Sequence, residues 1–485
     1  METGFEYLHY LDARSALYLV FADDCRLQKQ TLHYHNPKAV TKFSFAFLLL
    51  ICSILSHAQI LRESNLPIII INTEKDSNTG KFKDIPVDPR MNAYMKIIYR
   101  QDGSRNLVSD QNTSSFLNFD GKISIEQKGS TSQRLDKKPY TLTILGSGKK
   151  NNDHVSLLGM PSDNDWILNA LAYDSSLIRD YLSYDLARSM GEYAPRGVYC
   201  EVIVNDDYKG LYILLEKIKV GKDRVHIAKL SKEDESYPAI TGGYIVKADK
   251  PNGDPVAFVL KDSKDSTVRF INHYPKPEFI TPKQNEYINS VFNKLRDAMI
   301  AQNESMVDGY PSIIDVPNFI NFMLINELAS NVDGYQYSTY LHKDRNGKLR
   351  AGPVWDFNLT YGNDLFIWGY DRSHADLWQF DNNDNTGPRF WNDLYRNPTF
   401  RCQMAKRWKE LTQTGQPLDL NVIYKKIEER VSLLKEATER ESARWGKVGD
   451  HDMHIQKMKD WLSKRMNWMN EQLDQGVACP TTKKP

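Results

Sequence analysis

Cysteine is scarce in this sequence, with 5 in 485 residues. The positions are 25, 52, 200, 402 and 479. This spacing provides no pairs of zinc ligands and no dense disulfide framework, which excludes a zinc-finger module and a small disulfide-stabilised scaffold. A single bridge among Cys200, Cys402 and Cys479 stays open.

An excess of charge of one sign is also missing, because 63 basic residues balance 62 acidic ones. The balance gives no electrostatic reason to expect nucleic acid or an anionic membrane as the main partner. The chain also has no repeat of fixed period and no apolar run long enough for a comfortable membrane span. A hydrophobic content of 41% instead predicts a globular protein with a large core.

The N-terminal part carries a compartment signal. The apolar run 43–55 (FSFAFLLLICSIL) follows two lysines and precedes Ser56-His57-Ala58. A basic flank, a short apolar run and a small-x-small site are the parts of a secretory signal peptide, predicted at 40–58. We therefore expect export to the periplasm, the cell surface or the medium, with no integral span in the mature chain. Residues 1–39 are interpreted as a non-native or mis-assigned N-terminal extension.

Hydrophobic periodicity predicts a β-rich first half. Strands are expected over 122–127 and 140–145, on either side of a Gly/Ser loop, and again over 199–204 and 211–215. Apolar positions at helical spacing predict a helix over about 176–190, between the two pairs. This order of strand, loop, strand, helix, strand, strand is the order of a protein-kinase N-lobe.

The second half is expected to be mainly helical. Helices are predicted over 285–302, from an N-cap at Asp315 to about Ser330, and over about 419–440 and 452–474. The fold class that follows is α+β, a divergent protein-kinase-like two-lobe fold with a β-rich N-lobe and a helical C-lobe.

Two aspartates occupy special places in that second half. Asp333 follows the end of a helix, and Asp356 follows a hairpin whose turn is Asp344-Arg345-Asn346-Gly347. In protein kinases the catalytic aspartate and the metal-binding Asp-Phe-Gly occur in the same order. The pattern equally allows a reading in which Asp333 caps a turn and Asp356 ends a strand.

Long runs of the sequence resemble the CotH kinase family, in particular its exported bacterial branch. The resemblance extends from Leu66 to about Trp408 and is carried by KGSTSQ (128–133), KKPY (137–140), SLLGMPSDNDWIL (156–168), LIRDYLSYDLARSMGEYAPR (177–196), NDDYKGLYILLEKIK (205–219), TGGYIVKADK (241–250), INELASNVDGYQYSTYLHKD (325–344) and GPVWDFNLTYGN (352–363). It implies ATP and Mg²⁺ as cofactors and phosphorylation of serine or threonine in a protein substrate.

The resemblance also implies roles for single residues. Asp333 matches the catalytic aspartate and Asp356 the magnesium ligand, while Ser338 stands where the family often has a metal-binding asparagine. The phosphate-binding lysine is expected at Lys138 or Lys137. A backbone phosphate cradle is expected at Gly129, Ser130, Thr131 and Ser132. Lys128 stands where an arginine is usual.

Other residues have weaker assignments. Glu216 is expected where a kinase hinge begins, with an exposed acid at a strand end as the alternative. Arg179 and Asp174 lie on or beside the helix that should face the site. A structural ion pair is the expected role, with pairing to the lysine of the site as the alternative. Trp166 and Trp355 are expected to lie in the core.

The expected organisation divides the mature chain into an N-terminal β segment at 62–117, a kinase-like N-lobe and hinge at 118–250, a helical C-lobe at 251–475 and a tail at 476–485. The rival to a kinase is a non-catalytic module that uses the cleft for binding at the cell surface or in carbohydrate processing. This rival has weight because an exported protein meets little ATP and because Ser338 is a weaker metal ligand than the usual asparagine. Lys128 is a further departure that bears on catalytic strength.

Overall fold

A computed structural model describes residues 60–129, 134–146, 153–251, 253–261, 267–366 and 369–474. They belong to one compact unit, Gln59–Pro485. Several expectations lie outside the described residues: the extension 1–39, the signal peptide 40–58, loop residues Ser130, Thr131 and Ser132, and the tail 476–485 with Cys479.

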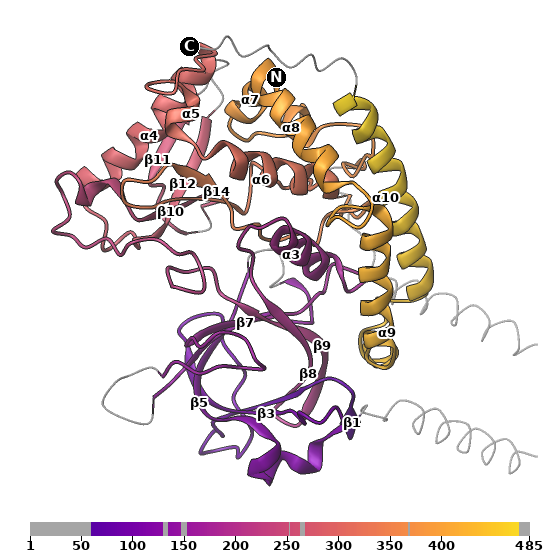
Figure 1. The fold of residues 1–485 in the computed structure, drawn as a ribbon. Helices are drawn as coiled ribbons and strands as arrows, with labels where there is room; N and C mark the ends of the chain where they lie inside the picture. Colours follow the sequence, from indigo (N-terminus) through magenta and orange to yellow (C-terminus); the bar gives the residue numbers. More distant parts are fainter. Residues whose placement is uncertain are drawn as a thin grey trace, which may run out of the picture. The chain divides into compact units, whose positions relative to one another are not determined.

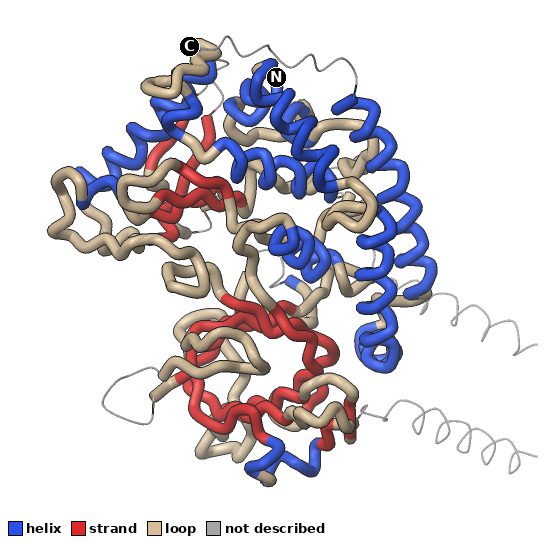
Figure 2. The backbone as a smooth tube through the Cα atoms, in the orientation of Figure 1, coloured by secondary structure: helices blue, strands red, loops and turns tan. Residues whose placement is uncertain are grey.

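Strands fill the first half of the described chain and helices most of the second (Figures 1 and 2). The strands are β1 Glu63–Ser64, β2 Ile68–Thr73, β3 Met91–Ile98, β4 Asn106–Leu107, β5 Leu117–Gln127, β6 Tyr140–Ile144, β7 Asp165–Asn169, β8 Gly197–Val204, β9 Asp207–Glu216, β10 Tyr244–Ala248, β11 Phe258–Lys261, β12 Thr267–Tyr274, β13 Thr339–Lys343 and β14 Leu349–Ala351. The α-helices are α3 Arg179–Ser189, α4 Pro282–Ile300, α5 Tyr310–Ile313, α6 Val316–Ala329, α7 Phe390–Arg396, α8 Pro398–Leu411, α9 Leu420–Trp445 and α10 His451–Asp474.

The first sheet closes into a barrel in the order β2-β3-β5-β6-β7-β9-β8. Closure comes from the parallel pairing of β2 with β8, while the other neighbours are antiparallel. Closure leaves no free sheet edge. Figure 2 shows this ring of strands beside the helices.

Side-chain alternation explains how both faces of the barrel are covered. In β9, Tyr212 and Leu214 belong to the core inside the barrel, whereas Leu211, Ile213 and Leu215 belong to the main core outside it. Successive side chains of a strand point to opposite faces, so a strand with a core on each side reads as a continuous apolar run. This accounts for the sequence LYILL in β9.

Helix α9 is attached to the barrel by a buried ion pair. Lys137 Nζ donates to Glu441 Oε1 of α9 at 2.6 Å and to the Leu211 carbonyl at 2.6 Å. The other carboxylate oxygen of Glu441 accepts from the Leu211 N–H at 2.8 Å. Gly210, at φ +92°, makes room for this contact, because a Cβ there would lie 2.2 Å from Glu441 Oε2. Lys137 therefore has a structural partner far from it in sequence.

We expect Glu441→Gln to destabilise the protein by about 3–5 kcal/mol, because it leaves the Lys137 ammonium buried without its counter-charge. The lysine side chain is only 3% exposed. Urea unfolding followed by circular dichroism measures the change. The matched control is Glu439→Gln on the exposed face of the same helix, which should change stability by less than about 0.5 kcal/mol. Equal midpoints for the two variants would contradict the assignment.

The second sheet is antiparallel, in the order β11-β12-β10-β13-β14. It contains the hairpin predicted around the 344–347 turn, with Leu341 opposite Ala351. Strand β10 pairs with β13 and connects this hairpin to the rest of the sheet. The chain leaving β14 reaches Trp355 and Asp356 within five residues.

Helix α6 leads to the other predicted site residue. Asp315 caps its N-terminus by accepting from the Asn318 N–H, as the sequence predicted. The helix is buried on nearly all sides and ends at Ser330, which adopts the left-handed conformation at φ 45°. This turns the chain sharply into Asn331-Val332-Asp333.

The mixed α and β content is confirmed, and the predicted helix near 176–190 corresponds to α3. Barrel closure was not foreseen. Figure 1 shows α3 between the barrel and the helices above it, and α3 packs against α6. Arg179 and Asp174 form the expected buried ion pair, and Trp166 lies in the barrel core.

The two cysteines among the described residues differ in oxidation state. Cys402 is disulfide-bonded, whereas Cys200 is a free thiol buried inside the barrel. Among the described residues, no helix is both long and apolar enough to cross a membrane.

Candidate active-site cleft

Two adjoining cavities lie where the barrel, the second sheet and the segment after β14 meet. We call the one of about 470 Å³ the acidic cavity, because Asp180, Asp333 and Asp356 line it. The other, of about 600 Å³, is the lysine cavity, lined by Lys128, Lys217, Lys247 and Lys276. The residues common to both are Lys128, Ile167, Lys247, Asp254, Tyr340 and Trp355. These shared walls make the two cavities one cleft.

The backbone at Asp356 is held by two residues of α3. The Asp356 N–H donates to the Tyr184 hydroxyl at 3.0 Å, and the Phe357 N–H donates to Asp180 Oδ1 at 2.7 Å. Asp180 and Tyr184 are four residues apart and share one helix face. Asp356 has φ +64°, a conformation that non-glycine residues seldom adopt and that these bonds help to maintain. The Asp356 carboxylate is exposed to the acidic cavity, while protein surrounds its other sides.

Asp333 and Ser338 reach the same cavity from the segment between α6 and β13. Ser338 Oγ donates to Asp356 Oδ2 at 3.2 Å. Asp333 Oδ1 accepts from Arg372 at 3.4 Å. The structure thus brings together the three residues that the sequence placed at a catalytic and metal site.

The three acids of this cavity all have raised pKa values. Burial and the charges of Asp180 and Asp333 raise the pKa of Asp356 to about 7, against the opposing effects of Lys128 and Ser338. Burial raises the pKa of Asp180 to about 6. Burial also raises the pKa of Asp333, although Arg372 and Lys250 oppose the shift. A nearby cation favours the ionised form of such carboxylates.

Cations face these acids across the cleft. Lys128 Nζ lies 4.6 Å from the centre of the Trp355 ring. Burial, together with the charge of Lys217, lowers the pKa of Lys128 to about 8, and the charge of Asp356 opposes this. A bound anion, such as a phosphate or a carboxylate, would favour the protonated form of Lys128. The cleft therefore has carboxylates and a buried ammonium group on its walls.

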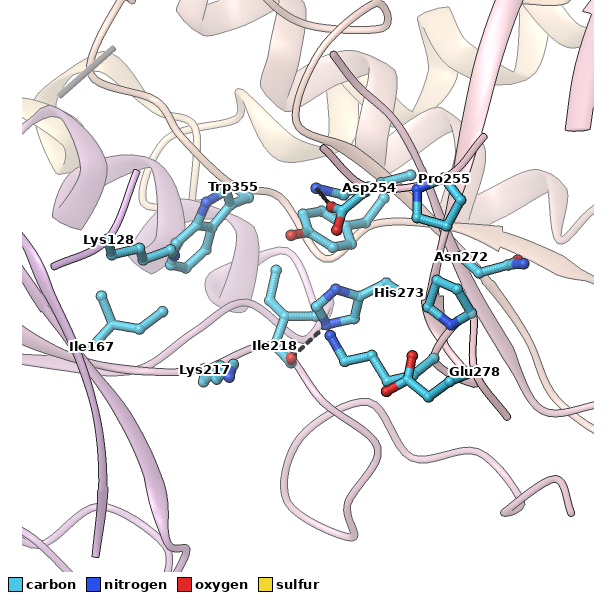
Figure 3. Close-up of a pocket in the computed structure, with 14 residues that line it drawn as sticks. Lys128, Ile167, Lys217, Ile218, Asp254, Pro255, Asn272, His273, Glu278 and Trp355 are labelled. Carbon is cyan, nitrogen blue, oxygen red and sulfur yellow. Dashed lines mark hydrogen bonds and ion pairs between the residues drawn. The ribbon is translucent and has the colours of Figure 1, made fainter. Parts of the chain in front are cut away.

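The lysine cavity, drawn in Figure 3, extends the cleft along the segment after β9. Lys217 and Ile218 form one wall, and Trp355 and Tyr340 contribute aromatic surface. His273 Nε2 lies 2.8 Å from the Ile218 carbonyl, and burial lowers the His273 pKa to about 3. The imidazole is therefore neutral, and it fixes the position of the Ile218 backbone.

The remaining residues predicted for the nucleotide site have different surroundings in the structure. Lys137 is paired with Glu441, as described above. Lys138 is half-buried, and its carbonyl accepts from the Tyr212 hydroxyl at 2.9 Å. Glu216 is fully buried and accepts from Arg196, while the next two residues line the lysine cavity. Gly129 lines the acidic cavity at φ +100°, as a phosphate cradle would require.

Sequence reasoning missed important parts of the cleft. Lys128 was noted only as a departure from the family, although it lines both cavities. Asp180 was hidden within a helical run, and only its i, i+4 spacing with Tyr184 hinted at a shared role. Trp355, expected in the core, is half-buried and forms part of the wall between the two cavities. No local sequence pattern indicated that Arg372 belongs to the cleft.

The acidic cavity contains part of the set of oxygen donors that a magnesium site needs. Among the described residues, no three His, Cys, Asp or Glu side chains converge into a metal cage. Mg²⁺ in phosphoryl-transfer sites is usually held by one or two carboxylates, with phosphates and water completing the shell. Asp356 and the neighbouring Ser338 hydroxyl fit such a partial donor set.

A family model described as CotH kinase protein matches residues 125–469. Inner spore coat protein H of Bacillus subtilis (strain 168) is 24% identical over 198 residues, which is 41% of this chain and 50% of that relative. The match thus covers about half the length of that curated relative. Because the family model spans well over half of the chain, including the barrel strands from β6 on and both site aspartates, this protein belongs to the CotH kinase protein family.

Proposed function

We propose that this protein is a CotH-type protein kinase, which transfers the γ-phosphate of ATP, bound with Mg²⁺, to serine or threonine of a protein substrate. The observation that carries the proposal is the convergence of Asp333, Asp356 and Ser338 in one cavity, opposite Lys128. In this proposal the barrel with α3 corresponds to a divergent kinase N-lobe, and the helices with the β13–β14 hairpin to the C-lobe.

Each residue has a distinct task in this proposal. Asp356, with Ser338, would hold the magnesium ion, which neutralises phosphate charge when bound. Lys128 would bind phosphate oxygens beside the Gly129 backbone, taking the role expected of Lys137 or Lys138. Asp333 would orient the acceptor hydroxyl and accept its proton. The lysine cavity, which adjoins Lys128 and has aromatic walls, would receive the nucleoside part of ATP.

Ser338 favours a second candidate, a non-catalytic binding module at the cell surface or in a carbohydrate-associated system. A serine hydroxyl is a poorer magnesium ligand than a carboxylate or amide oxygen. In this reading the cleft binds its ligand without phosphoryl transfer. Incorporation of label from radioactive ATP into the purified protein would distinguish the kinase from such a module.

We also propose that the protein is exported. The sequence around 40–58 has the parts of a signal peptide. Disulfides persist mainly in oxidising compartments, and Cys402 is disulfide-bonded. The related spore coat protein is named for a location on the spore.

Calorimetry tests the nucleotide site directly. We expect ATP to bind tightly only with Mg²⁺, and its affinity to fall as the pH is lowered through about 7. The sign follows from the acids: protons compete with the metal at Asp356, whose pKa is raised to about 7, so the metal-binding form is lost on acidification. The control is ATP titrated with EDTA at each pH, which should show little pH dependence. Binding that is equal with and without Mg²⁺ would refute the kinase proposal.

A further inference from the structure

Arg372 lines the acidic cavity, and a buried ion pair with Asp364 holds its side chain in place. Its side chain is 6% exposed, and that of its partner Asp364 is fully buried. Arg372 Nη2 and Nε donate to the two oxygens of the Asp364 carboxylate at 2.7 and 3.1 Å, and the Arg372 backbone N–H adds a bond of 3.0 Å. Burial alone would raise the pKa of Asp364, but the hydrogen bonds from Arg372 outweigh it and lower the pKa. The forked ion pair fixes the plane of the guanidinium.

The same arginine is anchored to the helical core through its backbone. Its carbonyl accepts from Gln379 Nε2 at 3.0 Å, and the Gln379 N–H donates to Glu327 of α6 at 2.9 Å. Two of the three guanidinium nitrogens are engaged with Asp364. The third, Nη1, points toward Asp333 and makes only a long contact with Oδ1, at 3.4 Å. Arg372 also lines the acidic cavity together with Asp356.

We infer that Arg372 is a further catalytic residue of the proposed kinase site, whose Nη1 contacts the phosphoryl group during transfer. The inference rests on the proposed function. In the reaction, the acceptor oxygen bonds to the γ-phosphorus while the bond from phosphorus to the bridging oxygen breaks. The bridging oxygen keeps the electron pair and leaves with ADP, and the acceptor proton goes to Asp333. In this inference the phosphoryl group passes between Asp333 and Asp356 in the cavity that Arg372 also lines.

Physical chemistry favours this role over a purely structural one. A prepositioned donor aimed at developing charge accelerates a reaction because it needs no reorganisation during the step. An arginine supplied within the same chain can neutralise charge on a transferring phosphoryl group. The Asp364 fork supplies the prepositioning, and the long Asp333 contact leaves Nη1 able to strengthen a bond to phosphate as charge develops.

The experiment compares Arg372→Gln with a matched control, Arg440→Gln. Arg440 also makes a bidentate pair with a fully buried carboxylate, Glu201, but it lies on α9 against the barrel. We expect Arg372→Gln to bind Mg²⁺–ATP within about threefold of wild type. Its rate of autophosphorylation should fall roughly 10²- to 10³-fold. Arg372→Lys keeps the charge but loses the forked pair with Asp364. Its rate of autophosphorylation should therefore lie between those of wild type and Arg372→Gln.

A second readout needs no acceptor. Wild type should bind Mg²⁺–ADP more tightly when aluminium fluoride is added, because that complex mimics the phosphoryl group in transfer. Arg372→Gln should lose this gain, and Arg440→Gln should keep it. A gain that survives in folded Arg372→Gln overturns the inference alone. If the glutamine variant unfolds, a gain in Arg372→Lys as large as that of wild type overturns it. Wild type that fails to bind Mg²⁺–ATP overturns the proposed function and the inference with it.

Discussion

Asp333→Asn should slow phosphoryl transfer by about 10²- to 10⁴-fold while leaving the affinity for Mg²⁺–ATP nearly unchanged. The substitution keeps the size of the side chain but removes the group that accepts the acceptor proton. Asp356→Ala should instead abolish the magnesium-dependent part of ATP binding, because it removes the only carboxylate of the proposed donor set. Calorimetry and radiolabel incorporation, measured on both variants, separate the two effects.

The neighbouring Asp371→Asn is a suitable control for these variants. Asp371 accepts from the Ser373 N–H and hydroxyl, so the change tests the loss of a nearby acid outside the cavity lining. It should keep both binding and transfer close to wild type. Equal ATP affinity in wild type and Asp356→Ala would mean that the cleft is not a working kinase site and would leave the binding module as the better explanation.

A second large effect on stability should come from breaking the Glu327–Arg465 pair. Both side chains are fully buried, and their closest atoms are 2.9 Å apart. Glu327 also accepts from the Tyr335 hydroxyl and the Gln379 N–H, while Arg465 donates to the carbonyls of Ala375 and Leu377. The pair thus ties α6 and α10 to the segment that follows Arg372. Arg465→Met should destabilise the protein by about 3–5 kcal/mol, because it leaves a buried charge without its partner.

A double-mutant cycle tests the origin of this loss. Glu327→Leu combined with Arg465→Met should be less destabilised than the sum of the two single variants, because the uncompensated charge is gone. Urea unfolding supplies the free energies. Additive losses would show that the two side chains act independently. The Arg465 variant should also lose transferase activity before it unfolds, because the segment carrying Arg372 depends on the same anchor.

Much of the local structure could be predicted from the sequence. Apolar spacing located α3 and α4, an Asn-Gly turn located the β13–β14 hairpin, and an aspartate followed by proline in the first turn located the start of α6. These signals depend on residues a few positions apart. The same short-range order placed Asp333 after a helix and Asp356 after a hairpin, and the family resemblance then assigned the roles of the two aspartates.

The phosphate-binding lysine was harder to predict for a physical reason. Lys137 and Lys138 lie beside a strand, and nothing local shows that Lys137 meets Glu441, 304 residues later. That partner removes Lys137 from the cleft. Lys128 lies only nine residues earlier, but its position over Trp355 depends on the second sheet reaching the barrel.

By itself, the sequence determined the family resemblance, the mixed α and β content and the two aspartates, because these are carried by short runs and local periodicity. Only the tertiary structure decided that the β segment closes into a barrel, that Asp180 and Arg372 join the acidic cavity, and that Asp356 has a pKa near neutrality. Barrel closure requires β2 to pair with β8, more than a hundred residues away. The charges and burial that shift a pKa come from segments that meet only in the folded chain.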